Sequence, residues 1–442
     1  MDENAFLEKS NVEKRRYLLI LVKKGDVNEF EKCSNLIAED SEKSKAFIIK
    51  WLLEKMCWTF WENQSKEIKR WKEIAEIDFR SKEFVFLSDY ISAYSIVLQC
   101  LQKSFYHPEN NVAKLRLNTI GKKDILEILS RLNGYGFEKL PYEIVKAQLI
   151  SILDRDEAAK RFNKIIDLKD SVVEASPFEK GMHTYFSEKE VLDRPNVGNI
   201  FSHNFIKGER AQCEKSDAPI VLISCDEVYF RKLAPLLALE KAAYPAIDFH
   251  IVFVAAEDVA KELIEEFELL EEAFARIRKD VRKRSISFSW LEAPEQKTRK
   301  NTFAACARFG VAKDMIERFN RPLFIMDIDM LIQGSPAAFF EKMSLYNFSG
   351  SIPTGLMSLV PWRRIMAGSL YVSNNKEGCR FLEDVEKYLI TGFSKNGEWY
   401  LDQNALSYAY ECLPFPQSRV FANNNDFDRP IVSRELCKSL LA

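Results

Sequence analysis

Apolar residues in the first part of the chain recur with a helical period. The period of three to four residues is clearest in three windows: 45–64, 88–105 and 123–132. Such spacing places the apolar side chains along one face of a helix, and residues 1–170 contain only two prolines that could interrupt it. The pattern predicts an all-helical domain over residues 1–170, in antiparallel hairpins joined by short turns such as 23–27.

Two stretches of this half, 21–37 and 151–167, each have the pattern of a turn followed by an amphipathic helix. They loosely resemble tetratricopeptide-type helical repeats, whose period is about 34 residues. No fixed period of that length is visible in the chain. A repeat array and a non-repetitive helical domain therefore both remain open.

The pattern changes in the second half of the chain. Residues 171–215 lose the periodicity and contain Pro177 and Pro195, which predicts a linker or an irregular segment. Short β-rich apolar runs then alternate with helical stretches; the runs are 218–227, 248–256, 285–293 and 321–329. This alternation predicts an α/β domain over residues 216–442, with a Rossmann-like, mixed but mainly parallel sheet flanked by helices. Ligands of such sheets bind beyond the carboxyl ends of the strands.

Composition narrows the class of protein. Lys plus Arg is 64 and Asp plus Glu is 66, so the net charge of −2 gives no electrostatic basis for a nucleic-acid partner. The nine cysteines are dispersed, without CxxC pairs or zinc spacing, as is typical of reduced thiols. The N-terminus is too polar for a signal peptide, and apolar runs such as 17–22 and 249–256 are too short to span a membrane. We expect a cytoplasmic protein with no membrane span, and the oligomeric state stays open.

The most informative chemistry stands at the end of the last of these strands. The apolar run Leu323–Met326 leads directly into Asp327 and Asp329. On an extended chain two carboxylates at this spacing point the same way, and they would repel each other unless a cation lay between them. Hard oxygen ligands suit Mg²⁺ or Mn²⁺, which also bind diphosphate oxygens. The alternative is that one or both aspartates cap a turn or form a salt bridge at the end of the strand.

Three segments in order carry a resemblance to a known family. They are Asn301–Pro336, which holds the acidic pair, Met366–Val372 with its alanine–glycine pair, and Tyr400–Leu406 with its aspartate–glutamine pair. Together they resemble the core of GT-A-fold glycosyltransferases, especially those of glycosyltransferase family 8. The resemblance covers about residues 218–430 and does not reach the helical half. It implies a hexosyltransferase-type enzyme with a nucleotide-sugar donor, a UDP-sugar, and a sugar or protein acceptor.

The resemblance also implies roles for single residues on the donor side of the site. Asp327 and Asp329 would hold Mn²⁺ or Mg²⁺ together with the ribose and diphosphate of the donor. The base of the nucleotide would lie against three residues at the end of the first strand: Ser224, Cys225 and Asp226.

Further roles follow for the sugar end of the site. Arg308 would lie near the donor diphosphate or sugar, and Ala367 and Gly368 would line the donor sugar pocket, where glycine allows close approach of the backbone. Asp402 and Gln403 would face the donor sugar or the acceptor hydroxyl. If Asp402 deprotonates the acceptor, the reaction inverts the anomeric centre; if it only lies beside the sugar, a retaining route follows.

One departure from the family concerns the metal site. Family members complete the metal shell with a histidine near the C-terminus, whereas all four histidines of this chain precede Asp327. In the matching stretch, 421–430, substitutes for it could be Asn424, Asn425, Asp426 or Asp428. The third ligand therefore stays open.

Two other functions were weighed against the transferase. A nucleotidyltransferase needs a glycine-rich phosphate loop after its first strand, and the loop 224–230 contains no glycine. A degenerate transferase domain could instead act with the helical half as a binding or scaffold protein, which the missing histidine favours. Loss of metal binding would distinguish this alternative from an enzyme.

Overall fold

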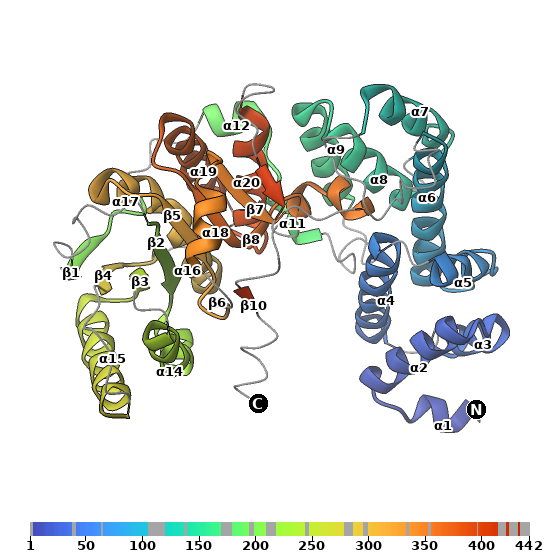
Figure 1. Ribbon diagram of the computed structural model, residues 1–442. Helices are drawn as coiled ribbons and strands as arrows, with labels where there is room; N and C mark the ends of the chain where they lie inside the picture. Colours follow the sequence, from blue (N-terminus) through green and yellow to red (C-terminus); the bar gives the residue numbers. More distant parts are fainter. Residues whose placement is uncertain are drawn as a thin grey trace. The chain divides into compact units, whose positions relative to one another are not determined.

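The chain forms two compact units. The structure, a computed structural model, describes residues 3–37, 41–62, 65–104, 120–136, 139–168, 179–193, 199–208, 218–243, 247–277, 286–294, 299–332, 336–351, 355–395, 397–413, 421–423 and 432–433. One unit comprises 1–189 and 353–364, and the other comprises 190–352 and 365–442 (Figure 1). The first is helical, and the second holds the sheet.

The helical unit confirms the helical prediction for the first half of the chain. Its elements are α1 (Glu3–Leu7), α2 (Asn11–Lys24), α3 (Val27–Ile37), α4 (Glu42–Glu62), α5 (Ser65–Ala75), α6 (Lys82–Ser104), α7 (Lys122–Leu132), α8 (Leu140–Ile150), α9 (Arg155–Asp167) and α11 (Glu179–His183), with the 3₁₀ helices η3 (Gly355–Leu359) and η4 (Pro361–Arg363). The predicted turn at 23–27 forms at Gly25, whose left-handed φ of 74° ends α2. Both stretches considered as possible repeat units are helical hairpins, since α2 packs against α3 and α8 against α9.

A short segment from the second half of the chain, 353–364, belongs to the helical unit. Trp362 of η4 is fully buried, with its ring 5.4 Å from that of Phe162 and directly over Gly181. Arg364 donates to the Ser151 hydroxyl at 2.5 Å. The sequence analysis did not separate this segment from the α/β domain, because its neighbours on both sides are strands of that domain.

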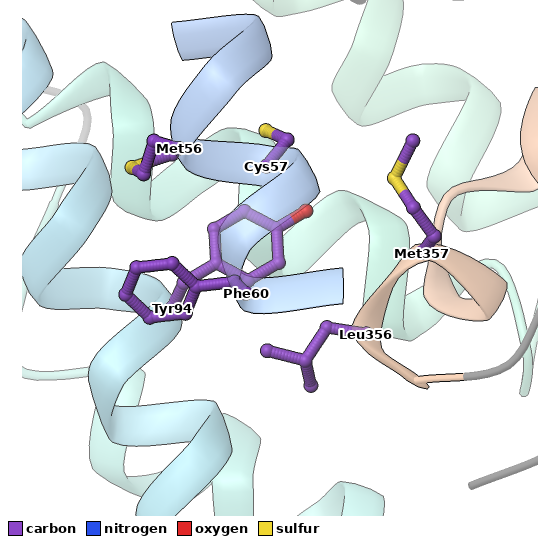
Figure 2. A pocket seen from close by; sticks show the side chains of 6 residues that line it. All are labelled: Met56, Cys57, Phe60, Tyr94, Leu356 and Met357. Carbon is purple, nitrogen blue, oxygen red and sulfur yellow. The ribbon is translucent and has the colours of Figure 1, made fainter. Parts of the chain in front are cut away.

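A small apolar cavity lies where this segment packs on the long helices, as Figure 2 shows. Its lining comes from α4, α6 and η3: Met56, Cys57, Phe60, Tyr94, Leu356 and Met357. Burial raises the pKa of the Cys57 thiol, so this cysteine is held as a neutral packing group.

Among the described residues, one helix has the length and hydropathy of a membrane span. It is Lys82–Gln102 in α6, with mean hydropathy 1.5 and 67% of the window buried inside the protein. From the sequence, 88–105 was expected to be a helix of the helical domain, and no membrane span was expected. α6 packs against α4, α5, α7 and α8, which accounts for its apolar character as the central helix of the unit.

The second unit is built on an eight-stranded mixed sheet. The strands are β1 (Asn204–Lys207), β2 (Ile220–Cys225), β3 (Asp248–Val254), β4 (Ile286–Leu291), β5 (Leu323–Met326), β7 (Phe348–Ser351), β8 (Met366–Val372) and β9 (Phe421–Asn423). Their order is β1-β4-β3-β2-β5-β8-β7-β9. Strands β4, β3, β2 and β5 are parallel, whereas β1 and β8 pair antiparallel with β4 and β5. A separate pair joins β6 (Leu331–Ile332) to β10 (Val432–Ser433).

Helices cover both faces of this sheet. They are α14 (Glu227–Ala243), α15 (Glu257–Ile277), α16 (Lys300–Gly310), α17 (Ala312–Phe319), α18 (Pro336–Met343), α19 (Lys376–Lys395) and α20 (Leu401–Cys412), while α12 (Glu188–Leu192) spans the unit boundary. Alternate residues of β2 divide between the two layers: Val221 and Ile223 pack with α14 and α15, and Ser224 contacts α16. This arrangement confirms the predicted sheet flanked by helices.

The predicted elements differ from the observed ones in three respects. The segment 366–372, which was singled out only by the resemblance to a known family, forms β8, whereas β1, β7 and β9 are too short and irregular for their periodicity to predict them. The helix expected after residue 301 is broken at Val311 into α16 and α17. The stretch 171–215, expected as a linker, contains α11, α12 and β1.

Candidate functional site

Polar side chains from three elements meet at the carboxyl end of β5. Because β8 runs antiparallel to β5, the first residues of β8 lie beside the last residues of β5, and the Asp327 N–H donates to the Gly368 carbonyl at 3.0 Å. The C-terminal part of α16 supplies Arg308, and the first turn of α20 supplies Asp402. The fold thus gathers side chains that are far apart in sequence at the edge where ligands of parallel sheets bind.

Arg308 is the centre of this cluster. Its side chain is 2% exposed, and one guanidinium nitrogen lies 2.7 Å from Asp327 Oδ1 and 3.8 Å from Asp402 Oδ2. The same nitrogen donates to the Ala367 carbonyl at 3.1 Å. The two carboxylates are more accessible, at 32% for Asp327 and 16% for Asp402. A buried cation therefore holds two acids that both reach the surface.

Ser224 fixes the helix that carries Arg308. Its hydroxyl donates to the Ala304 carbonyl at 2.5 Å and accepts from the Arg308 backbone N–H at 3.1 Å. The serine is buried, so both of these bonds are shielded from water. Its hydrogen bonds link β2 to α16 and so place Arg308 relative to the sheet.

The two residues that follow Ser224 have other surroundings. Cys225 is buried in the opposite layer with Phe230 and Phe253, and burial raises the pKa of its thiol. Asp226 accepts from the Tyr229 N–H at 2.8 Å and thereby caps α14. The structure thus brings Ser224 next to Arg308 but not the Cys225 side chain, which the sequence analysis had placed with the nucleotide base.

Asp327 and Asp329 lie in a turn and not on the extended chain that the sequence analysis assumed. β5 ends at Met326, and the Met330 N–H donates to the Asp327 carbonyl at 3.2 Å, so the chain reverses over these residues before β6. Both aspartates are partly exposed. Asp327 also forms the salt bridge that the alternative interpretation allowed for.

Gly368 lies directly against this turn. A Cβ atom at Gly368 would be 2.9 Å from Met330 Sδ and 3.4 Å from Asp327 Oδ2. Contacts below 3.0 Å are too close for a side chain unless a neighbour moves. The absence of a side chain here keeps the backbone of β8 close to the acidic turn.

The environment of Asp402 alters its proton affinity. Burial raises the pKa of its carboxyl, and the charge of Arg308 partly opposes that effect. The neighbouring Gln403 donates its backbone N–H to Asp402 Oδ1 at 2.8 Å. A carboxylate with a raised pKa, held at the rim of a site, is suited to accept a proton.

The acidic turn fits a divalent cation only in part. Asp327 and Asp329 provide hard carboxylate oxygens, and one oxygen of Asp327 already faces the Arg308 charge. Among the residues that the structure describes, no three His, Cys, Asp or Glu side chains gather into a metal-binding group. Two carboxylates are nevertheless a usual protein contribution to an Mg²⁺ or Mn²⁺ site that takes its remaining oxygens from water and substrate phosphate.

Several predicted positions lie outside the described residues. These are the possible substitutes for the missing histidine: Asn424, Asn425, Asp426 and Asp428. Arg299, the N-cap of α16, pairs with Glu398 at 2.8 Å. The sequence analysis did not single out Glu398, since only its place four residues before Asp402 points to the site.

Comparisons with known proteins found no matching protein-family model and no matching curated protein. Two solved structures are similar, and both are glycosyltransferases. The apo form of GlyE from Streptococcus pneumoniae TIGR4 has a TM-score of 0.27 and 16% identity, over 44% of each chain. The apo form of the bifunctional WbbM has a TM-score of 0.30 and 12% identity, over 72% of this chain and 59% of that one. This chain thus spans only about half the length of the proteins it matches.

Proposed function

We propose that the sheet-containing unit is a GT-A-like glycosyltransferase that transfers a hexose from a nucleoside-diphosphate sugar, in the presence of Mn²⁺ or Mg²⁺. The observation that carries the proposal is the buried Arg308, which binds Asp327 and Asp402 from the carboxyl edge of the sheet. A buried guanidinium holding two partly exposed acids keeps them in fixed positions near the surface. Charged groups held in fixed positions can stabilise the charge that develops on the substrate in a transition state.

The donor would bind at the acidic turn. Asp327 and Asp329 would hold the cation, whose charge would favour departure of the nucleoside diphosphate. Gly368, which leaves no side chain beside Asp327 Oδ2, would let the donor sugar approach the backbone of β8. Arg308 is too deeply buried to be a main contact of the diphosphate, so its role is to position the two acids.

Asp402 would act at the acceptor. In this step the acceptor oxygen forms a bond to the anomeric carbon, the bond from that carbon to the phosphate oxygen breaks, and Asp402 takes the proton of the acceptor hydroxyl. The raised pKa of Asp402 supports this role, because a stronger base accepts the proton more readily. This route inverts the anomeric configuration, and NMR of the first product formed would show whether it does.

The test is hydrolysis and transfer by the purified full chain. UDP-, GDP- and ADP-sugars are incubated with Mn²⁺ or Mg²⁺, and release of the nucleoside diphosphate is followed. We expect one donor to be hydrolysed slowly and Asp329→Ala to abolish the reaction. Asp258→Ala, at an exposed position of α15, is the matched control and should retain it.

The alternative of a binding or scaffold protein gives a different result. Calorimetry with Mn²⁺ then shows no binding that depends on Asp327 and Asp329, and no nucleotide sugar raises the melting temperature. That pair of results would exclude the transferase.

A further inference from the structure

The backbone just before Asp402 is held in a costly conformation. The Leu401 N–H donates to the Glu398 carbonyl at 3.3 Å, which closes a turn with Trp399 and Tyr400 at its centre. Tyr400 has φ 75° and ψ 5°, the left-handed region that this turn position usually reserves for glycine. A bulky residue there costs about 1–3 kcal/mol and persists only where the surrounding structure enforces it.

Contacts on both sides hold this turn to the site. Glu398 pairs with Arg299, the N-cap of the helix that carries Arg308. On the other side, the fully buried Leu401 begins α20, and the Tyr400 carbonyl accepts from the Asn404 N–H at 3.0 Å. The turn therefore has a fixed position relative to Arg308 and Asp402.

The indole ring of Trp399 stands exposed on this anchored turn. Trp399 is 48% exposed, although Glu398 before it is held by an ion pair and Leu401, two residues after it, is buried. An exposed aromatic residue is common by itself. Its position on a strained turn beside a candidate catalytic acid is not, because backbone strain is concentrated at functional sites.

Two acceptor atoms, on the first residue of this turn and on the helix that follows it, also lack donors. One oxygen of Glu398 and the side-chain oxygen of Gln403 are shielded from solvent, and neither receives a hydrogen bond from any residue that the structure describes. A buried acceptor left without a donor costs about 1–3 kcal/mol. Hydroxyl groups of a ligand, brought in by a small side-chain movement, are donors of the kind required.

We propose that Trp399 is the platform on which the ring of an acceptor sugar stacks, so that the acceptor is a glycan or a glycoside and not a bare peptide. The inference rests on the proposed function. Along the cluster the order is Asp327, then Arg308, then Asp402. Trp399 lies three residues before Asp402 in the chain, on the turn that leads into α20. The donor diphosphate belongs at the Asp327 end, so a ring over Trp399 is on the acceptor side. The apolar face of a pyranose packs on the broad indole face, while its hydroxyls reach Glu398 and Gln403.

The activity test compares three variants with acceptor glycosides of glucose, galactose and N-acetylglucosamine. Trp399→Ala should raise the acceptor KM about tenfold, and the ratio of sugar transfer to donor hydrolysis should fall with it. Trp399→Phe keeps an aromatic face and should recover most of the affinity. The control is Trp58→Ala, because Trp58 on α4 is also 48% exposed, and both measurements should remain at the wild-type value. An unchanged acceptor KM in Trp399→Ala would overturn the proposal.

A binding measurement separates this proposal from the proposed function. In protein labelled with 5-fluorotryptophan, the resonance missing from Trp399→Phe identifies Trp399, and the three methyl glycosides are titrated with the nucleoside diphosphate and Mn²⁺ present. We expect the Trp399 resonance to move and the Trp58 resonance to stay. If donors are hydrolysed but the Trp399 resonance does not move, the proposed stacking role of Trp399 is wrong and the proposed transferase function is retained. If the resonance moves and no donor is hydrolysed, the transferase is wrong and a sugar-binding site remains.

Discussion

Each unit of the protein contains a buried charged cluster, and the two clusters are built in opposite ways. In the helical unit a carboxylate lies at the centre: Glu143 of α8 is 2% exposed, with one oxygen 2.6 Å from Lys146 and the other 3.2 Å from Arg161. In the sheet-containing unit a cation lies at the centre, Arg308, and its two carboxylates extend toward the surface.

Under the proposed function, this difference assigns the chemistry to the Arg308 cluster. Both oxygens of Glu143 are paired and Lys146 also donates to the Tyr135 carbonyl, so the helical cluster is closed. A cluster whose charges are all paired inside the protein affects the stability of the fold and the specificity of its packing. The Arg308 cluster leaves acidic groups accessible, and burial raises the pKa of the Asp402 carboxyl against the opposing charge of Arg308. Accessible acids with a shifted pKa are typical of binding and catalytic sites. The comparison predicts that changes in one cluster alter activity and changes in the other alter stability.

The largest expected effect is on activity, from Arg308→Met. Without the guanidinium, the two acids lose their common partner and their fixed positions. We expect kcat/KM for donor hydrolysis to fall about 1,000-fold, equivalent to ~4 kcal/mol of transition-state stabilisation. Arg308→Lys keeps the charge but not the planar fork and should recover little.

Arg321 provides the matched control within the same unit. It is also buried, and it donates to Asp248 at 2.6 Å and to the Ala218 carbonyl, away from the acidic turn. Arg321→Met should lower the free energy of unfolding and leave kcat/KM of the folded protein intact. If both variants reduce kcat/KM equally, the loss reflects instability, and Arg308 has no special role.

The next effect is on stability, from Glu143→Ala. Removing the central carboxylate leaves Lys146 buried without its counter-charge, which should lower the free energy of unfolding by about 3 kcal/mol. The loss should lie at the low end for a buried pair, because Arg161 is 31% exposed and can be solvated. Urea unfolding measures it, and donor hydrolysis per folded molecule should not change. A fall in that rate would mean that the closed cluster also serves the site.

Two glycines sharpen the same comparison with smaller changes. Gly181→Ala in the helical unit would put its Cβ 2.2 Å from the Trp362 ring, so overpacking should cost about 1–3 kcal/mol of stability. Gly368→Ala meets the flexible Met330, which can move, and the carboxylate of Asp327 at 3.4 Å. We expect little loss of stability there and about a tenfold fall in kcat/KM. Both quantities are measured on both variants. The melting temperature should fall more in Gly181→Ala, and the rate of donor hydrolysis should fall more in Gly368→Ala.

The architecture of this protein could be predicted from sequence where local patterns determine it. The helices of the first half and the strands β2, β3, β4 and β5 follow from periodicity and were placed to within a few residues. The segment that forms β8 was singled out only by the resemblance to a known family. The segment 353–364 could not be assigned, because its place in the helical unit depends on long-range contacts such as Trp362 with Phe162.

The candidate site shows the same limit. Asp327 was singled out by its place after an apolar strand, and Gly368 and Asp402 by the resemblance to a known family. The structure brings all three around Arg308. What local pattern could not supply is the turn at Asp327 and the burial of Arg308. Both depend on the antiparallel β8 strand, whose carbonyls at Ala367 and Gly368 accept from these residues.

The smallest expected effect is a pH dependence of the stability of the sheet-containing unit. It arises at a buried polar side chain whose hydrogen-bonding atoms are all paired, like those of Glu143. His250 of β3 is fully buried, with Nδ1 2.6 Å from the Ser287 hydroxyl and Nε2 2.9 Å from that of Ser289. Burial lowers its pKa to about 3, and electrostatic interactions with His203 and Arg318 add to this.

The sign of the pH effect follows from that pKa. Below about pH 6.5, His250 binds a proton in the unfolded chain but stays neutral in the folded protein. The contribution of this group to the free energy of unfolding is therefore complete above pH 6.5 and is lost as the pH falls toward 3. The slope approaches about 1.4 kcal/mol per pH unit, or about 1 kcal/mol between pH 6.5 and 5.5. Urea unfolding at pH 7.5 and 5.5 should show this loss in the wild type and a smaller one in His250→Asn, whose amide does not titrate. Equal losses in the two proteins would assign the pH dependence to other groups. A loss confined to the wild type, with donor hydrolysis retained in His250→Asn, would show that a fully paired buried group is structural even in the unit that carries the site.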